Sequence, residues 1–161
     1  RDAQRKRVLV VRAVGGPAQG PLAHGDRRRL PRAGRRFRPR ARSWLSVDLD
    51  PDYPGIDEVM DVTALTLPDS SFDLVLCSHV LDVVEGHDEA VRELHRVTRL
   101  GGTTLIQAPR RGASTSPGAY AVRLRAAGFH VEQVILPEQT DEATRRRLGL
   151  DAGDPIFSCR R

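Results

Sequence analysis

The stretch 71–109 constrains the fold of this chain more than any other, because it predicts a strand, a helix and a second strand in succession. Residues 72–77 form a short apolar run that is typical of a strand buried on both faces. Residues 87–99 then follow helical spacing, and 103–108 form a second β-branched run. The apolar stripe of the helix consists of Ala90, Val91, Leu94 and Val97. Strand, helix and strand within this length predict a right-handed crossover between parallel strands.

Further elements are predicted on both sides of this stretch. Residues 119–127 predict a helix with Val122 and Leu124 as its apolar contacts and Gly128 as its C-cap. Alternating strands and helices predict an α/β fold with a mostly parallel sheet. The additional strands are expected at 7–14, 43–50, 56–60, 129–136 and 155–160.

Two helix ends have recognisable signals. Gly101 and Gly102 are expected to end the helix 87–99, since glycine readily adopts the left-handed conformation that follows many helices. Thr140 is expected to cap a charged helix at 141–148, which has acids in its first turn and arginines in its last.

Length and composition narrow the class of protein. The 161 residues suit one domain, and no apolar run approaches the roughly 18 residues of a membrane span. The basic N-terminus lacks the apolar region of a signal peptide. Two cysteines, Cys77 and Cys159, make neither a disulfide framework nor a zinc site, so we expect no metal and a cytoplasmic protein.

Charge is distributed very unevenly along the chain. The net charge of +5 combines +12 in residues 1–42 with −7 in residues 43–161. We therefore distinguish a basic, arginine-rich segment at 1–42, with the expected first strand and a glycine loop, from an α/β part at 43–161. Together they are expected to form a single domain.

A glycine loop is expected after the strand 7–14, because the backbone must approach a bound nucleotide closely there. Gly15, Gly16 and Gly20 are present, but no GxGxxG spacing can be laid over them without a gap. This loop is therefore atypical or degenerate for a cofactor-binding turn.

Residues 26–42 contain nine arginines among 17 residues, with prolines and a glycine that interrupt any helix. Such a segment could neutralise phosphates of a nucleic acid, although Phe37 is the only stacking residue within it. It could instead be a solvated like-charged segment. A third interpretation is that it replaced an ordinary helix through a frame change in GC-rich DNA.

The amino-acid sequence resembles a known family from about residue 46 to residue 134. FDLVLCSHVLDVV followed by EAVRELHRVTRLGG is similar to the "FDLV…HVLEH…EL.RVLKPGG" pattern of class I S-adenosylmethionine-dependent methyltransferases of type 11. SVDLDP and DVTALTLPDSSFD extend the match upstream, and LRAAGFHVEQV extends it more loosely downstream. The resemblance implies a Rossmann-like three-layer sandwich whose last strand is antiparallel and lies beside the fifth.

The resemblance also implies cofactor-binding residues. Asp48 matches the acid that binds the ribose hydroxyls, with Leu49 beside it, although an aspartate that merely ends a strand is the plainer interpretation. Asp61 would accept a hydrogen bond from the adenine amino group, and the Val62 backbone amide would face the ring. Gly15 and Gly16 complete the expected cofactor site on the other side.

Ser78 and His79 follow the strand 72–77, at the carboxyl edge where open α/β sheets bind ligands. They are expected near the cofactor. His79 is a weak candidate for a general base, and the alternative is a packing or loop residue. Methyl transfer from a sulfonium needs a base only if the acceptor carries a proton of high pKa, so the catalytic residues stay unknown.

The sequence leaves several functions open. The leading hypothesis is a methyltransferase that uses S-adenosylmethionine on a small-molecule acceptor. A non-enzymatic interaction module on a degenerate methyltransferase fold is the alternative, with nucleic-acid binding through the arginine-rich segment as a special case. A nicotinamide-dependent oxidoreductase is disfavoured, because the dinucleotide fingerprint is missing.

Overall fold

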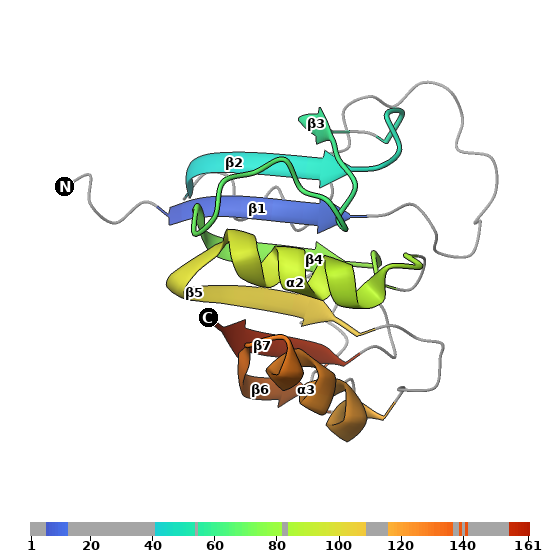
Figure 1. Ribbon diagram of the computed structural model, residues 1–161, viewed down its shortest axis with the longest axis vertical. Coiled ribbons are helices and arrows are strands. Elements are labelled where there is room, and N and C mark those ends of the chain that lie inside the picture. The colour runs from blue at the N-terminus through green and yellow to red at the C-terminus, as the bar shows by residue number, and fades with distance from the viewer. Residues whose placement is uncertain are drawn as a thin grey trace.

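The computed structural model describes residues 6–12, 41–53, 55–81, 84–108, 116–136, 139, 141 and 155–161. These residues form one seven-stranded sheet with the order β3-β2-β1-β4-β5-β7-β6, together with two helices (Figure 1). The elements are β1 Lys6–Arg12, β2 Ala41–Asp48, β3 Glu58–Val59, β4 Phe72–Ser78, α2 His87–Val97, β5 Thr98–Gln107, α3 Pro117–Ala126, β6 His130–Ile135 and β7 Ile156–Arg160.

Strand directions agree with the predicted class. β1 pairs in parallel with β2 and β4. β4 also pairs in parallel with β5, and the helix α2 connects these two strands. β7 runs antiparallel between β5 and β6. The predicted α/β fold, the parallel crossover and the antiparallel last strand beside β5 are therefore confirmed.

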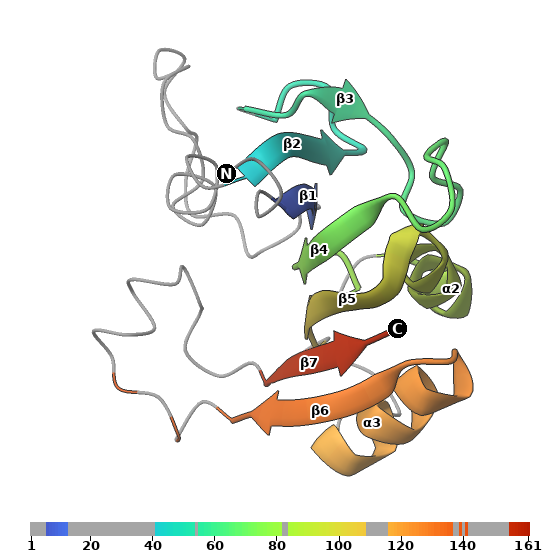
Figure 2. The ribbon, with the colours of Figure 1, turned by 90° about the vertical axis from the view of Figure 1, so that its left-hand side faces the viewer.

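The core lies between the sheet and the two helices. α2 and α3 lie on the same side of the sheet, as Figure 2 shows. α2 buries the four residues of the predicted stripe, Ala90, Val91, Leu94 and Val97. A three-layer sandwich also needs a helix layer on the opposite side, and this part of the prediction lies outside the described residues.

The end of α2 differs from the prediction. The helix ends at Val97, and Thr98 is already extended, with its hydroxyl donating to the Leu94 carbonyl at 2.6 Å. Gly101 and Gly102 do not end the helix but lie inside β5, where the pairing with β4 shifts register. Gly101 has a φ of 74°, so this glycine pair serves a strand irregularity rather than a helix end.

The packed face of α3 also differs from the prediction. Val122 is 63% exposed, so its predicted role as an apolar contact is wrong, whereas Leu124 is buried as predicted. Tyr120 and Ala121 make up the rest of the buried face. Leu124 lies about one turn after Tyr120 and Ala121, so the three side chains share one side of the helix. Val122 points away from that side.

Several boundaries can be compared directly with the structure. β1 spans 6–12, so it begins one residue before the predicted strand 7–14, and residues 13 and 14 lie outside the described part. α3 begins one residue after Ser116, whose hydroxyl accepts a hydrogen bond from the Ala119 N–H. Gly128 follows the helix with a φ of 101°, as its predicted place at the C-cap requires. Residues 142–148 of the predicted helix 141–148 lie outside the described residues.

Candidate functional site

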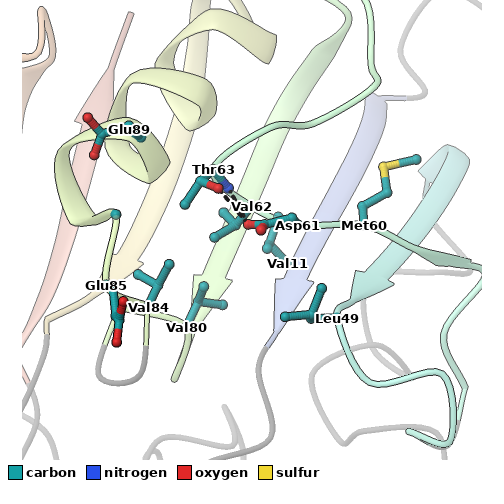
Figure 3. Close-up of a pocket in the computed structure, with 11 residues that line it drawn as sticks. Val11, Leu49, Met60, Asp61, Val62, Thr63, Val80, Val84, Glu85 and Glu89 are labelled. Atoms are coloured by element: carbon teal, nitrogen blue, oxygen red, sulfur yellow. Dashed lines mark hydrogen bonds between the residues drawn. The ribbon is translucent and has the colours of Figure 1, made fainter.

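A pocket of about 350 Å³ lies at the carboxyl edge of the parallel part of the sheet (Figure 3). The parallel strands β1, β2, β3 and β4 all end at this edge, so the loops that follow them meet there. The pocket is lined by Val11, Leu49, Met60, Asp61, Val62, Thr63, Val80, Val84, Glu85, Gly86 and Glu89.

The walls of the pocket are mostly aliphatic. Val11 comes from the end of β1, Leu49 follows β2, and Met60 and Val62 follow β3. On the other side, Val80 belongs to the loop after β4. Such walls suit a flat, weakly polar ring, which buries apolar surface without leaving polar groups unsatisfied.

Asp61 is the most clearly organised polar group of the pocket. Its Oδ1 atom accepts hydrogen bonds from the Thr63 backbone N–H at 2.8 Å and from the Thr63 hydroxyl at 2.7 Å. These two bonds, the backbone one first, hold the pKa of the Asp61 carboxyl below its ordinary value of 3.8. The carboxylate is therefore ionised at neutral pH and acts only as an acceptor.

Two more carboxylates, Glu85 and Glu89, line the pocket beside the N-terminus of α2. The Oε1 atom of Glu89 pairs with Arg92 at 2.7 Å, and both side chains are exposed. Gly86, between them, precedes the first residue of α2. Three acidic side chains, Asp61, Glu85 and Glu89, thus line the pocket, and acidic side chains favour a ligand with positive charge.

Asp48 ends β2 and is buried, with 1% of its surface exposed. Its Oδ1 atom accepts a hydrogen bond from the Asp50 N–H at 2.9 Å, and its carbonyl accepts one from the Met60 N–H at 3.0 Å. Leu49 is 63% exposed and lines the pocket. Leu49 thus lines the pocket, whereas Asp48, one residue earlier, is buried and is not among the residues that line it.

Ser78 and His79 lie at the same edge of the sheet but are not among the residues that line this pocket. The Ser78 hydroxyl donates to the Gln107 side-chain oxygen at 2.7 Å, which joins the ends of β4 and β5. His79 has a φ of 61°, a left-handed conformation that marks a sharp turn of the chain after β4.

The structure thus brings together three predicted site residues, Leu49, Asp61 and Val62, in one pocket. Gly15 and Gly16 lie outside the described residues, as does most of the arginine-rich segment. The sequence signals did not single out Thr63 or Gly86. Thr63 could have been found from its spacing two residues after Asp61, which is typical of a side-chain turn.

Two absences hold for the part of the chain that the structure describes. Within it, no group of three or more His, Cys, Asp or Glu side chains is placed to hold a metal ion. None of its helices is long and apolar enough to cross a membrane.

The topology and the pocket define a class of protein, the α/β proteins with a pocket at the carboxyl edge of a parallel sheet, the edge where such sheets commonly bind ligands. Comparison with known families narrows this class. Residues 39–106 match the model of a methyltransferase domain family. The resemblance read from the sequence is confirmed there. A search of the curated proteins finds no match.

Solved structures with the same fold extend the comparison to the whole chain. An S-adenosylmethionine-dependent methyltransferase from Mesorhizobium loti is 20% identical, with a TM-score of 0.65 over 100% of this chain and 93% of that chain. The 1,6-didemethyltoxoflavin-N1-methyltransferase of Burkholderia thailandensis is 16% identical, with a TM-score of 0.61 over 99% and 72%. The [4+2]-cyclase SpnF is 17% identical, with a TM-score of 0.65 over 98% and 74%.

At these identities the comparisons show the fold, which is that of the S-adenosylmethionine-dependent methyltransferases. A cyclase shares it, so the fold alone does not fix the reaction.

Proposed function

We propose that this protein is an S-adenosylmethionine-dependent methyltransferase that acts on a small-molecule acceptor. The observation that carries the proposal is the pocket at the carboxyl edge, where Leu49, Asp61 and Val62 line one cavity. All three lie within the segment 39–106 that matches the methyltransferase domain.

The properties of the pocket fit the adenosine part of the cofactor. Aliphatic walls from Val11, Leu49 and Val80 suit the faces of an adenine ring, and the volume of about 350 Å³ leaves room for it. The ionised Asp61 carboxylate is an acceptor for the exocyclic amino group. The acidic residues that line the pocket suit a cofactor that carries a sulfonium and an ammonium group.

Each residue of the site then has a role. Asp61 binds the adenine amino group, the Val62 backbone amide faces the ring, and Asp48 binds the ribose hydroxyls with Leu49 covering the sugar. Gly15 and Gly16, which lie outside the described residues, are the remaining proposed cofactor-binding residues. S-adenosylmethionine supplies an activated methyl group, so the protein's main task is to hold the acceptor in line with it.

The end of β4 supplies two further residues that belong near the proposed cofactor site. Ser78 and His79 lie at the same edge of the sheet, next in sequence to the pocket residue Val80. His79 serves as a general base only for an acceptor whose proton has a high pKa. A small-molecule acceptor is supported by the Burkholderia thailandensis relative, whose structure contains 1,6-didemethyltoxoflavin and S-adenosylhomocysteine.

Isothermal titration calorimetry with S-adenosylmethionine and S-adenosylhomocysteine tests the proposal. We expect both to bind the wild-type protein below millimolar concentration. Replacing Asp61 by Asn, or Asp48 by Asn, should weaken binding about tenfold to hundredfold, because each removes a hydrogen bond to a charged acceptor.

Asp52→Asn is the matched control for these two variants. Asp52 is an exposed carboxylate in the loop after β2 and is not among the residues that line the pocket, so its replacement should leave the affinity unchanged. If neither cofactor binds the wild-type protein below millimolar concentration, the methyltransferase proposal is wrong for this chain, and a non-enzymatic role for the fold becomes the better account.

A further inference from the structure

Thr63 makes two different contacts in the pocket, one with each wall. Its hydroxyl and its backbone N–H donate to the same oxygen of Asp61, at 2.7 and 2.8 Å (Figure 3). The bonds occupy Oδ1, so they fix the plane of the carboxylate and leave its second oxygen to define the acceptor direction. Thr63 therefore controls how Asp61 is presented.

The methyl group of Thr63 faces the opposite wall. A Cβ atom added to Gly86 would lie 2.9 Å from the Thr63 Cγ2 atom, closer than real carbon atoms approach. Gly86 has an ordinary φ of −81°, so its backbone would accept alanine, and the constraint is this contact alone. The loop after β3 and the loop before α2 thus meet at Thr63 and Gly86.

The two contacts depend on one torsion angle. Threonine is branched at Cβ, so its hydroxyl and methyl groups move together when χ1 changes. While the hydroxyl is bonded to Asp61, the methyl group is held against Gly86. A shift of the loop before α2 would therefore move the Thr63 side chain and, through it, the Asp61 carboxylate.

We propose that Thr63 is a positioning residue that couples the Asp61 carboxylate to the loop at Gly86, and so sets the affinity for the adenine part of the ligand. This inference rests on the proposed cofactor site. It concerns a residue that the sequence signals did not single out, and it predicts that the two functional groups of one side chain have separable effects.

Matched variants separate the two groups. Thr63→Val keeps the shape and removes the hydroxyl, whereas Thr63→Ser keeps the hydroxyl and removes the methyl group. Thr63→Val should weaken S-adenosylhomocysteine binding about threefold to tenfold, as expected for one lost hydrogen bond. Thr103→Val, in β5 and outside the pocket lining, is the control and should bind like the wild type.

The pH dependence distinguishes positioning from a loss of packing. Without the hydroxyl bond, the pKa of Asp61 should rise towards its ordinary value. Because the ligand needs the ionised carboxylate, binding by Thr63→Val should begin to fall at a higher pH than binding by the wild type. Thr63→Ser should keep the wild-type profile. An unchanged profile in Thr63→Val overturns the proposal.

The coupling to Gly86 is tested by a double variant. Gly86→Ala should weaken binding in the wild-type background, because its Cβ would displace the Thr63 methyl group. In the Thr63→Ser background that methyl group is absent, so Gly86→Ala should weaken binding much less there than in the wild-type background. Equal effects of Gly86→Ala in both backgrounds overturn the coupling.

Failure of the proposed function gives a different result. If the wild-type protein binds no S-adenosylhomocysteine, the cofactor proposal fails, but the Asp61 pKa is still measured without ligand by carbon-13 NMR of labelled aspartate. The Thr63 inference then stands if Thr63→Val raises that pKa and Thr63→Ser does not. Circular dichroism limits the comparison to the pH range in which each variant is folded.

Discussion

The two cysteine thiols are buried in the sheet, Cys77 in β4 and Cys159 in β7. Burial raises the pKa of Cys159 to about 12, so almost no thiolate forms at neutral pH. We expect neither thiol of the native protein to react with an aromatic disulfide reagent at about pH 8, and both to react after denaturation. Fast reaction of either thiol in the folded protein would contradict the buried placement.

His87, at the start of α2, gives a second prediction for a single residue. Its Nε2 atom lies 3.3 Å from the Tyr120 hydroxyl, and burial, followed by the charge of Arg123, lowers the pKa of His87 below its ordinary value of 6.5. The unfolded chain therefore takes up the proton first as pH falls, so stability should decrease below about pH 6.5.

Urea unfolding at about pH 7.5 and pH 5.5 measures this effect. His87→Gln should lose less stability between the two values than the wild type. His95 has a pKa lowered in the same direction, by burial and then by Arg161, and accounts for the dependence that remains. An identical loss in wild type and His87→Gln would exclude His87 as a source.

How much could be predicted at the residue scale depends on the kind of signal. The positions of Asp48 and Asp61 after their strands followed from the alternation of apolar runs and acids. Their different environments did not, because burial depends on loops that pack from elsewhere in the chain. Asp48 is buried, whereas Asp61 is exposed and bonded to Thr63.

Among the elements, α2 is tied to the loop before β4 by one arginine. The Arg96 guanidinium donates to the carbonyls of Leu65 and Leu67 at 2.8 and 2.7 Å, and to Asp69 at 2.6 Å. It also forms two hydrogen bonds with Glu93, at 2.7 and 2.8 Å. One side chain thus satisfies several backbone and side-chain acceptors of a segment without regular structure.

Arg96→Ala should lower the free energy of unfolding by about 2–3 kcal/mol, since it leaves these acceptors without their donor. Arg92→Ala is the matched control in the same helix. Arg92 pairs with Glu89 on the surface, so its loss should cost less than about 0.5 kcal/mol. Equal effects of the two variants in urea unfolding would show that the Arg96 contacts add no stability.

The elements themselves were predictable where their periodicity was strong. The stripe of α2 follows helical spacing, and its four residues are buried as predicted. The glycine pair Gly101–Gly102 was misread, because a glycine that ends a helix and a glycine in a strand bulge give the same local signal. Only the pairing of Thr98 with Phe72 across the sheet distinguishes them.

For the whole molecule, the position of β1 governs how the arginine-rich part can be studied. β1 lies between β2 and β4 in the middle of the sheet, so residues 1–42 include a central strand. This arrangement supports the proposal that 1–42 and 43–161 fold as a single domain. Deleting 1–42 is therefore a poor test of nucleic-acid binding, since it removes that strand.

A change of charge is the better test of the open nucleic-acid hypothesis. Replacing the arginines of residues 26–40 by glutamine leaves β1 and β2 in place. Binding of a DNA duplex that comes from this segment should weaken steeply with salt in the wild type and be lost in the variant. Undiminished binding by the variant would place any such interaction elsewhere in the chain.

The central place of β1 also predicts a difference in stability between strands. Leu9 is fully buried in β1, whereas Val59 is 53% exposed in the two-residue edge strand β3. Leu9→Ala should lower the free energy of unfolding by about 2–5 kcal/mol, because it leaves a cavity in the core. Val59→Ala should change it by less than about 0.5 kcal/mol.

Urea unfolding followed by circular dichroism measures both variants, and a shift of the midpoint at constant slope identifies a change in stability. If Leu9→Ala unfolds at the wild-type midpoint, β1 does not contribute to the core. β1 lies between β2 and β4 in the sheet and supplies Val11 to the pocket. A variant that destabilises β1 is therefore expected to weaken binding in the pocket as well.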